Sequence, residues 1–378
     1  IHVTSIMLHL SYFKYLLVSK IVYVYLNNRF MKKILFLFVL FPIVTFGQSE
    51  KEIDSLKRVI SSEKLPIDKI QSYKKLIEFY LATGSNESSK YIDDLNRLNN
   101  NELCPKCEGL YYYYKSIKNN ISGGDPSETL QNLDKSIAIS KLIKDEDDLF
   151  YTAVYEKIDV LIAIKNYKNA QTLLLSTEQY FKKTKNEFFL NNIYSQYAHF
   201  YQKQGYNNLA IEMYFKVYKY YLKNKKEDID SRIYLLTEIS LLYLDLNKTN
   251  KATEYIDLAV ELTKKSKSQI QIIGAKYKKG VIEHRKKSYR NSLKYFNEIF
   301  VPLEKSENVV YKCATASFIA RNYIALKDYK RAAYYTSIAV EGFKNANNPP
   351  YLSLSLLNRA RISFANGDYI NAKKDIDT

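Results

Sequence analysis

The feature that most constrains the fold is a small residue that recurs along the chain at a nearly constant spacing. From Ser89 to Ala372, successive members lie 40, 41, 40, 42, 40, 40 and 40 residues apart. Such a period is typical of stacked repeats, because one helical pair cannot bury its apolar face and neighbouring copies bury it jointly. The members, called ladder positions below, are Ser89, Thr129, Ala170, Ala210, Ala252, Ser292, Ala332 and Ala372.

Each copy has the pattern of two helices joined by a tight turn. The chain has only 10 Gly and 7 Pro, which favours helices over a β fold with many turns. A small residue that would let two helices approach closely lies twelve positions before the ladder in the last five copies: Ala198, Ser240, Gly280, Ala320 and Ala360. Five positions before the ladder, where a left-handed residue would end the first helix, stand Gly84, Gly124, Lys165, Gly205, Asn247, Lys287, Lys327 and Gly367.

The turn carries a family resemblance. Positions 367–372 read Gly-Asp-Tyr-Ile-Asn-Ala, and positions 327–332 read Lys-Asp-Tyr-Lys-Arg-Ala. With the small residue before it, this turn resembles the tetratricopeptide repeat over about residues 63–378. The first three copies depart from the family pattern because Ile77, Ile117 and Ile158 replace the small residue, and the period exceeds the ~34 residues of the standard repeat. HEAT and armadillo repeats have about this period but not this turn.

The resemblance implies an all-α fold, a tetratricopeptide-like α-α superhelical solenoid of about eight helix-turn-helix repeats in which the first helices line a concave groove. In that family, residues fifteen and eleven positions before the ladder face the groove. The groove residues so implied are Ser195, His199, Tyr277, Arg321 and Arg361. For His199, a solvated side chain is favoured over a ligand contact. The Lys–Asn pair with which some members grip a peptide carboxylate is absent at these positions, which argues against a chaperone adaptor of that kind.

No motif in the sequence favours catalysis. Cys104 and Cys107 form the only CxxC and stand at the start of a predicted helix, where they could close a local disulfide or remain two packed thiols. A zinc site would need two more ligands at suitable spacing, and a thioredoxin-like site would need a βαβ setting. Cys313 is predicted to lie in the core. Phosphate-loop, nucleophile-elbow, kinase and dinucleotide motifs are missing. We therefore predict no enzyme activity, no cofactor and no metal site.

The amino-terminal segment has the pattern of an export signal. Met31 and two lysines precede an apolar run to Phe46, and small residues stand before Gln48. This pattern predicts a signal peptide at 31–47, with an uncleaved anchor as the alternative. Residues 1–30 are interpreted as upstream sequence or a second hydrophobic segment, residues 48–62 as a leading helix or linker, and residues 63–378 as the repeat array. The expected location is the periplasm or cell envelope.

The formal charge of +17 has two interpretations. A basic chain can bind nucleic acid or an anionic surface. Because the lysines are spread along the chain, we favour lysines that solvate the outer faces of helices. The densest basic segment is 276–290, with Tyr277 and Tyr289 interleaved. We predict that this chain binds no nucleic acid.

The function predicted from these features is an interaction module that holds a protein or peptide in the concave groove. A signal peptide followed by such repeats resembles the exported sensor regions of Bacteroidetes transcriptional regulators and histidine kinases that contain these repeats. That resemblance implies periplasmic sensing and an output domain in a longer chain. The array reads as incomplete at its end, so a membrane anchor beyond Thr378 is also expected. The alternative is a stand-alone secreted or surface scaffold with no output domain.

Overall fold

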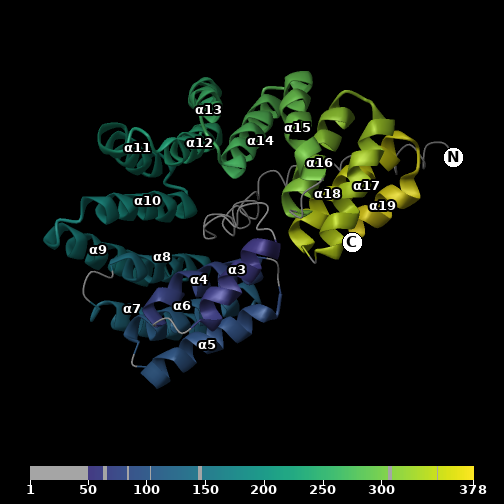
Figure 1. Cartoon of the computed structure of the whole chain (residues 1–378). Coiled ribbons are helices and arrows are strands. Elements are labelled where there is room, and N and C mark those ends of the chain that lie inside the picture. Colours follow the sequence, from purple (N-terminus) through teal and green to yellow (C-terminus); the bar gives the residue numbers. More distant parts are fainter. Residues whose placement is uncertain are drawn as a thin grey trace. The chain divides into compact units, whose positions relative to one another are not determined.

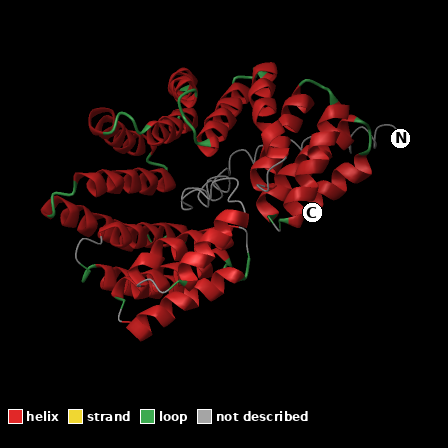
Figure 2. Cartoon of the chain, viewed as in Figure 1, coloured by secondary structure: helices red, strands yellow, loops and turns green. Residues whose placement is uncertain are grey.

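The computed structural model describes residues 50–62, 66–82, 85–102, 104–143, 147–304, 309–346 and 348–378. In these ranges the regular structure is entirely helical, with no strand (Figure 2). The predicted signal peptide at 31–47 and residues 1–30 lie outside the described residues. No helix in the described ranges has the length and apolarity needed to cross a membrane.

The helices follow one another with short connections. Their bounds are α3 (Glu50–Ser61), α4 (Pro66–Ala82), α5 (Glu87–Glu102), α6 (Pro105–Ile121), α7 (Pro126–Ser140), α8 (Asp147–Ala163), α9 (Tyr167–Lys183), α10 (Glu187–Gln204), α11 (Asn207–Asn224), α12 (Ile229–Asp245), α13 (Thr249–Thr263), α14 (Gln269–Arg285), α15 (Tyr289–Glu304), α16 (Val309–Ala325), α17 (Tyr329–Asn345), α18 (Pro349–Ala365) and α19 (Tyr369–Asp377).

After α3, the helices pair into hairpins that stack in chain order (Figure 1). Each even-numbered helix from α4 to α18 is the first helix of a hairpin, and the odd-numbered helix that follows it is the second. Every ladder position lies in a second helix. The fold is therefore the helical solenoid that the 40-residue period predicts, because each hairpin buries its apolar face against its neighbours.

Small residues bring the two helices of a hairpin together. From Thr129 to Ala372, each ladder residue is at most 1% exposed, whereas Ser89 in the first hairpin is half-buried. The small residues twelve positions earlier are buried as well. Gly280 shows why size matters, since a Cβ built on it would lie 2.8 Å from the ring of Phe296. In the first three hairpins, Ile77, Ile117 and Ile158 fill the same buried position.

A left-handed residue ends most first helices where the sequence predicts it. Positive φ is found five positions before the ladder at Lys165, Gly205, Asn247, Lys287, Lys327 and Gly367. The prediction for Gly124 is wrong, because the left-handed residue there is Gly123 (φ 72°). In the other turns one residue both closes the first helix and caps the second. In this turn the two roles fall on different residues: Gly124 closes α6, and Asp125 caps α7 ahead of Pro126. The turn is therefore one residue longer than the others. Gly84 lies outside the described residues.

Tyrosine pairs recur at the hairpin turns. Tyr243 stacks on Tyr255 with centroids 5.4 Å apart, and Tyr323 stacks on Tyr335 at 5.9 Å. A basic residue next to the ladder covers the outer ring, as the Arg331 guanidinium does 4.5 Å from the centroid of Tyr323. A stacked pair covered in this way buries the apolar faces of both rings while the polar groups stay at the edge of the stack. This packing accounts for tyrosines at the hairpin turns.

The first helices form the more closely packed layer. Most consecutive first helices contact one another, as α12 does α14 and α16 does α18, whereas consecutive second helices show no comparable packing in the described chain. The layer with the shorter spacing lies on the inside of a bend, so the first helices line the inner side of the array. This layer carries the predicted groove residues.

Two glycines of α14 give a matched test of the close approach. We expect Gly280→Ala to lower the free energy of unfolding by about 1–3 kcal/mol, because the added Cβ overlaps Phe296. Gly274→Ala, where a Cβ would meet nothing within 4 Å, should raise it by about 0.5–1 kcal/mol through helix propensity. Urea unfolding followed by circular dichroism measures both. Equal effects of the two substitutions would contradict the packing role of Gly280.

Candidate functional site

Polar side chains tie several first helices to the next one along the inner layer. The Tyr114 hydroxyl donates to Glu78 at 2.7 Å, and Asn120 Nδ2 donates to Glu156 at 2.9 Å. Further along, Lys278 pairs with Glu238, and Asn358 Nδ2 donates to the Ser317 hydroxyl at 3.1 Å. Partners in these ties are about one repeat apart in the chain. The inner layer is therefore a polar surface whose side chains are held at defined positions.

A buried acidic cluster lies between α8 and α10. Glu156 is 1% exposed, Asp159 4% and His199 7%. Both carboxylate oxygens of Asp159 and Oε2 of Glu156 lack a hydrogen-bond partner among the described residues. His199 Nε2 lies 3.8 Å from Asp159 Oδ1, which is beyond hydrogen-bond reach. Three of the four carboxylate oxygens thus have no hydrogen bond to compensate for the lost hydration, so the cluster holds charge poorly.

The ionisation of this cluster follows from its burial. Burial raises the pKa of Glu156 to about 7, although the hydrogen bond from Asn120 opposes the shift. Burial and the nearby Glu156 raise the pKa of Asp159 well above its usual value, with Lys203 opposing. Burial, reinforced by Lys203, lowers the pKa of His199 well below its usual value. Burial therefore disfavours the charged forms of both Asp159 and His199.

Glu156 should make stability depend on pH. Its folded pKa of about 7 lies above the usual 4.5, so its contribution is full below about pH 4.5 and is lost as the pH rises through about 7. Glu156→Gln keeps an acceptor for Asn120 and should raise the free energy of unfolding at pH 8 by up to roughly 3 kcal/mol. Urea midpoints between pH 5 and about 8 test this. The exposed Glu187→Gln is the control, and an unchanged slope in Glu156→Gln would contradict the assignment.

A basic aromatic surface, formed by Tyr277, His284, Phe318, Arg321 and Arg361, spans α14, α16 and α18. The Tyr277 ring lies 5.6 Å from Phe318, and the Arg321 guanidinium lies 4.8 Å from the centre of Phe318. His284 meets Phe318 edge-on at 6.0 Å. Residues from consecutive first helices thus form one continuous surface.

The arginines of this surface act on His284. Burial is the largest cause that lowers the pKa of His284 to about 4, and the positive charges of Arg321, Arg285 and Arg361 lower it further against the hydrogen bond that His284 donates to Asn322. His284 is therefore neutral at pH 7. Burial also raises the pKa of Tyr277 well above its usual value and that of Tyr311 and Tyr351 to about 12, so all three phenols are neutral.

A chain of hydrogen bonds fixes the His284 ring. Asn322 Nδ2 donates to the Ser292 hydroxyl at 2.9 Å and to the Phe318 carbonyl at 3.0 Å, which places Asn322 Oδ1 toward His284. The distance from Oδ1 to His284 Nδ1 is 2.8 Å. Since Oδ1 can only accept, Nδ1 carries the proton and Nε2 is an acceptor. The ladder residue Ser292 in turn donates to the Gly280 carbonyl at 2.8 Å, so packing and surface chemistry are linked.

The structure separates the predicted groove residues into two groups. Tyr277, Arg321 and Arg361 come together on the basic aromatic surface. Ser195 and His199 lie on α10, and His199 is buried rather than solvated, because α8 packs over it. The sequence analysis missed the roles of His284 and Phe318. Their only signal is their place in first helices, where Phe318 lies one helical turn from Arg321 and His284 lies two turns from Tyr277.

The cysteines form one local disulfide and one buried thiol. Cys104 and Cys107 form a disulfide with Cα atoms 5.2 Å apart, and Cys104 is the residue that caps α6. Of the two alternatives left open by the sequence, the local disulfide is the one present. Cys313 is buried, as predicted. The described residues contain no group of three His, Cys, Asp or Glu side chains that could hold a metal ion.

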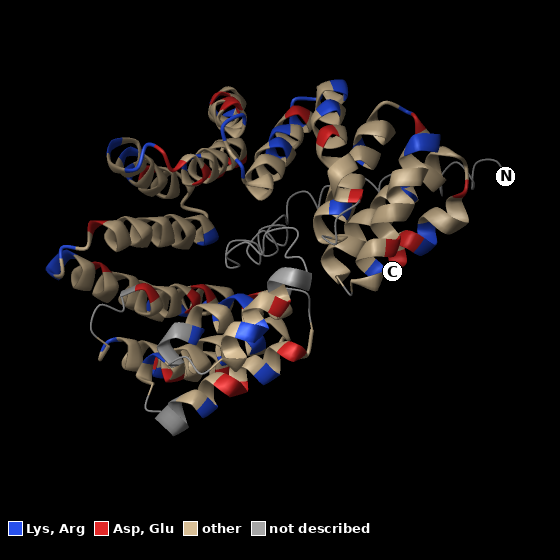
Figure 3. Cartoon of the chain, in the orientation of Figure 1, with Lys and Arg blue, Asp and Glu red and all other residues tan. Residues whose placement is uncertain are grey.

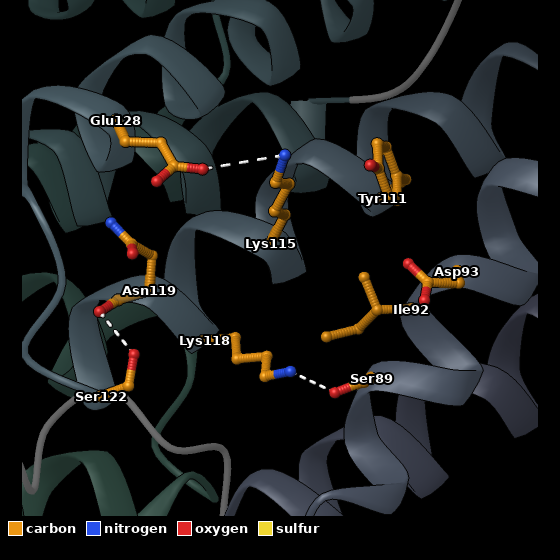
Figure 4. A pocket seen from close by; sticks show the side chains of 9 residues that line it. All are labelled: Ser89, Ile92, Asp93, Tyr111, Lys115, Lys118, Asn119, Ser122 and Glu128. Carbon is orange, nitrogen blue, oxygen red and sulfur yellow. Dashed lines mark hydrogen bonds and ion pairs between the residues drawn. The ribbon is translucent and has the colours of Figure 1, made fainter.

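A separate cavity of about 330 Å³ lies where α5, α6 and the start of α7 meet (Figure 4). Its cations are already engaged. Lys115 Nζ lies 3.7 Å from Glu128, and Lys118 donates to the hydroxyl of Ser89. The cavity therefore offers less for recognising a ligand than the basic aromatic surface does.

Comparisons with solved structures identify the fold. A signal-transduction ATPase with a tetratricopeptide repeat sensor from Pyrococcus horikoshii matches with a TM-score of 0.59 and 13% identity, covering 86% of this chain and 52% of that one. This chain thus spans about half the length of that ATPase. The apo quorum sensor NprR from B. thuringiensis matches with a TM-score of 0.56 and 13% identity over 87% and 91% of the two chains.

Two further structures extend the comparison. Apo RapI matches with a TM-score of 0.55 and 13% identity over 96% of both chains. NprR in complex with its cognate peptide NprX matches with a TM-score of 0.51 and 14% identity over 87% and 92%. At this identity the likeness shows the fold alone, which is that of tetratricopeptide-like helical repeats. Neither family models nor curated proteins match the sequence.

Proposed function

We propose that this chain is a binding module that holds a peptide or an extended protein segment on the inner layer of first helices. The observation that carries the proposal is the basic aromatic surface, where Tyr277, Arg321 and Arg361 from three consecutive first helices form one face. Half-buried rings give apolar contact area, and guanidinium groups give directional hydrogen bonds. NprR, which shares the fold, has been solved with a bound peptide.

We further infer that the module is exported and serves as the periplasmic sensing part of a longer membrane-anchored signalling or transcription-regulatory protein. The signal-peptide pattern at 31–47 supports export. The archaeal ATPase supports the sensor role by analogy, because there a tetratricopeptide repeat sensor is one part of a longer signalling chain. The second candidate, a stand-alone secreted or surface scaffold, shares the export signal and the binding layer but has no output domain.

Peptide selection tests the binding role. A library of random dodecapeptides displayed on phage, selected against the purified chain, should yield sequences whose synthetic forms bind with micromolar or better affinity. Hydrogen exchange of the complex should slow in α14, α16 and α18, because the ligand covers these first helices. The second helices α15, α17 and α19 of the same hairpins serve as the internal control. Protection confined to those second helices, or no selectable peptide, would sink the proposal.

A reporter fusion tests export. Residues 31–378 followed by alkaline phosphatase, which is active only outside the cytoplasm, should give an active enzyme in a Gram-negative host. The matched control begins at Gln48 behind a new start codon and should be inactive. Mass spectrometry of the exported fusion should place its amino terminus at Gln48. Equal activity of both fusions, or none from the first, would contradict a signal at 31–47.

A further inference from the structure

The turns that join first to second helices differ in charge along the array. Each turn is contained in ten residues, from seven positions before the ladder residue to two positions after it. In the first five hairpins these segments contain six basic and six acidic residues, at 82–91, 122–131, 163–172, 203–212 and 245–254. In the last three hairpins they contain ten basic and two acidic residues, at 285–294, 325–334 and 365–374. Figure 3 shows blue bands where α14 passes into α15.

Most of the ten basic side chains have no carboxylate partner. Lys286 pairs with Glu283, and Arg331 pairs with Asp328. The two acidic residues of the three segments cap second helices, Asp328 at α17 and Asp368 at α19. The other eight basic residues are exposed and form no ion pair in the described part of the chain: Arg285, Lys287, Arg290, Lys294, Lys327, Lys330, Lys373 and Lys374.

Large apolar side chains are exposed among these charges. Leu326 is 39% exposed, Tyr334 58%, Tyr369 45% and Ile370 85%. Leu326 directly precedes Lys327, and Ile370 lies in the first turn of α19. A single exposed apolar residue needs no explanation, whereas several beside unpaired basic residues indicate an interaction surface.

The three turns lie next to one another. The first helices α14, α16 and α18 pack together in succession, and the carboxyl end of each leads into its turn. Asn322, near the end of α16, donates to Ser292, near the start of α15, at 2.9 Å. Adjacent helices lie about 8–10 Å apart, so the side chains of neighbouring turns form one strip. We call the exposed residues of 285–294, 325–334 and 365–374 the basic turn edge.

We propose that the basic turn edge docks on the surface of a bilayer that contains anionic lipids. Exposed lysine and arginine side chains are attracted to the negative charge of such a surface. The apolar side chains among them can enter the headgroup region, where contact with acyl chains replaces contact with water. A nucleic acid would use the charge alone, because bases stack on aromatic rings and not on Leu326 or Ile370.

This surface goes beyond the proposed peptide binding, because it lies at the ends of the first helices and not along their inner side. Docking through the edge would leave the inner layer open to a peptide. The signal-peptide pattern at 31–47 supports the proposal, since an exported chain meets a membrane surface.

Local fluorescence tests the docking. Ile370→Cys in the full chain is labelled with an environment-sensitive NBD dye. The matched control is Leu142→Cys, because Leu142 is 88% exposed but lies in the turn between α7 and α8. The new thiol takes the label, since Cys313 is buried and the other two cysteines form the disulfide.

The two labelled chains are mixed with vesicles of phosphatidylcholine alone, or of equal parts phosphatidylcholine and phosphatidylglycerol. Dye fluorescence at position 370 should rise at least about twofold with the anionic vesicles, because the dye leaves water. It should change much less with phosphatidylcholine alone, and the dye at position 142 should respond to neither. Because the readout is local, binding through residues 1–47 would affect both labelled chains alike.

Charge variants of the Ile370→Cys chain locate the docking surface. The edge variant carries four substitutions: Lys287→Gln, Arg290→Gln, Lys327→Gln and Lys330→Gln. It should raise the lipid concentration for half-maximal response at least about tenfold, as should about 0.5 M salt. The control variant removes the same charge from exposed positions in or beside the turns that join second to first helices: Lys223→Gln, Lys226→Gln, Lys265→Gln and Lys267→Gln. It should respond as the parent chain does.

Several outcomes overturn the proposal. An equal response to both kinds of vesicle excludes anionic lipid, and this comparison decides even if the edge variant fails to fold. Equal losses in the edge and control variants show attraction to overall charge only, and an equal response at position 142 shows adsorption without a defined face. Binding of a labelled oligothymidylate that the edge variant loses, with no response to vesicles, assigns the surface to nucleic acid.

The docking test and the peptide test are independent. Selected dodecapeptides should bind the edge variant as tightly as the unchanged chain, because the substitutions leave the inner layer intact. Failure of docking with retained peptide binding therefore overturns only the membrane proposal.

Discussion

The close approach of two helices at a pair of small residues is the contact on which the rest of this structure depends. In the hairpin of α14 and α15, Gly280 lies against the ring of Phe296, and its carbonyl accepts a hydrogen bond from Ser292. A larger side chain at either position would separate the helices and lose both the packing and the hydrogen bond. Because the same contact recurs in most hairpins, each unit has nearly the same geometry, and stacking brings equivalent positions into one row.

That row explains why residues one repeat apart form the polar features of the inner layer. Asn322 reaches both Ser292 at the ladder and His284 on the preceding first helix, so a packing contact also orients a surface side chain. The same stacking closes α8 and α10 over Asp159 and His199. Buried polar groups without full compensation weaken a junction. The stability of the array should therefore depend on pH around Glu156 and Asp159 of α8.

Charge and aromatic area are used differently in the two layers. The basic residues that face second helices are largely paired with acidic side chains, and others cover tyrosine rings at the turns. On α16 and α18 the inner side has arginine and aromatic rings but no acidic residue. The total charge of the chain therefore says little about recognition. What matters is which layer carries the charge, and the last three first helices contain more basic than acidic residues.

The sequence by itself determined the repeat, the two helices of each copy and most turn positions, because these depend on local backbone preferences and on the size of residues at a fixed spacing. The repeat register placed Tyr277, Arg321 and Arg361 on the first helices. It predicted the left-handed residue at Gly124 where the structure has it at Gly123, and it predicted a solvated His199 where the structure has a buried one. Only the tertiary structure decided that Asp159 lies under α10 and that His284 lies within the field of two arginines from later helices. These interactions join residues about 40 to 77 positions apart, and such pairs leave no local signal in the sequence. The reason is that the burial of a side chain and the charges around it depend on how each hairpin is rotated against the next.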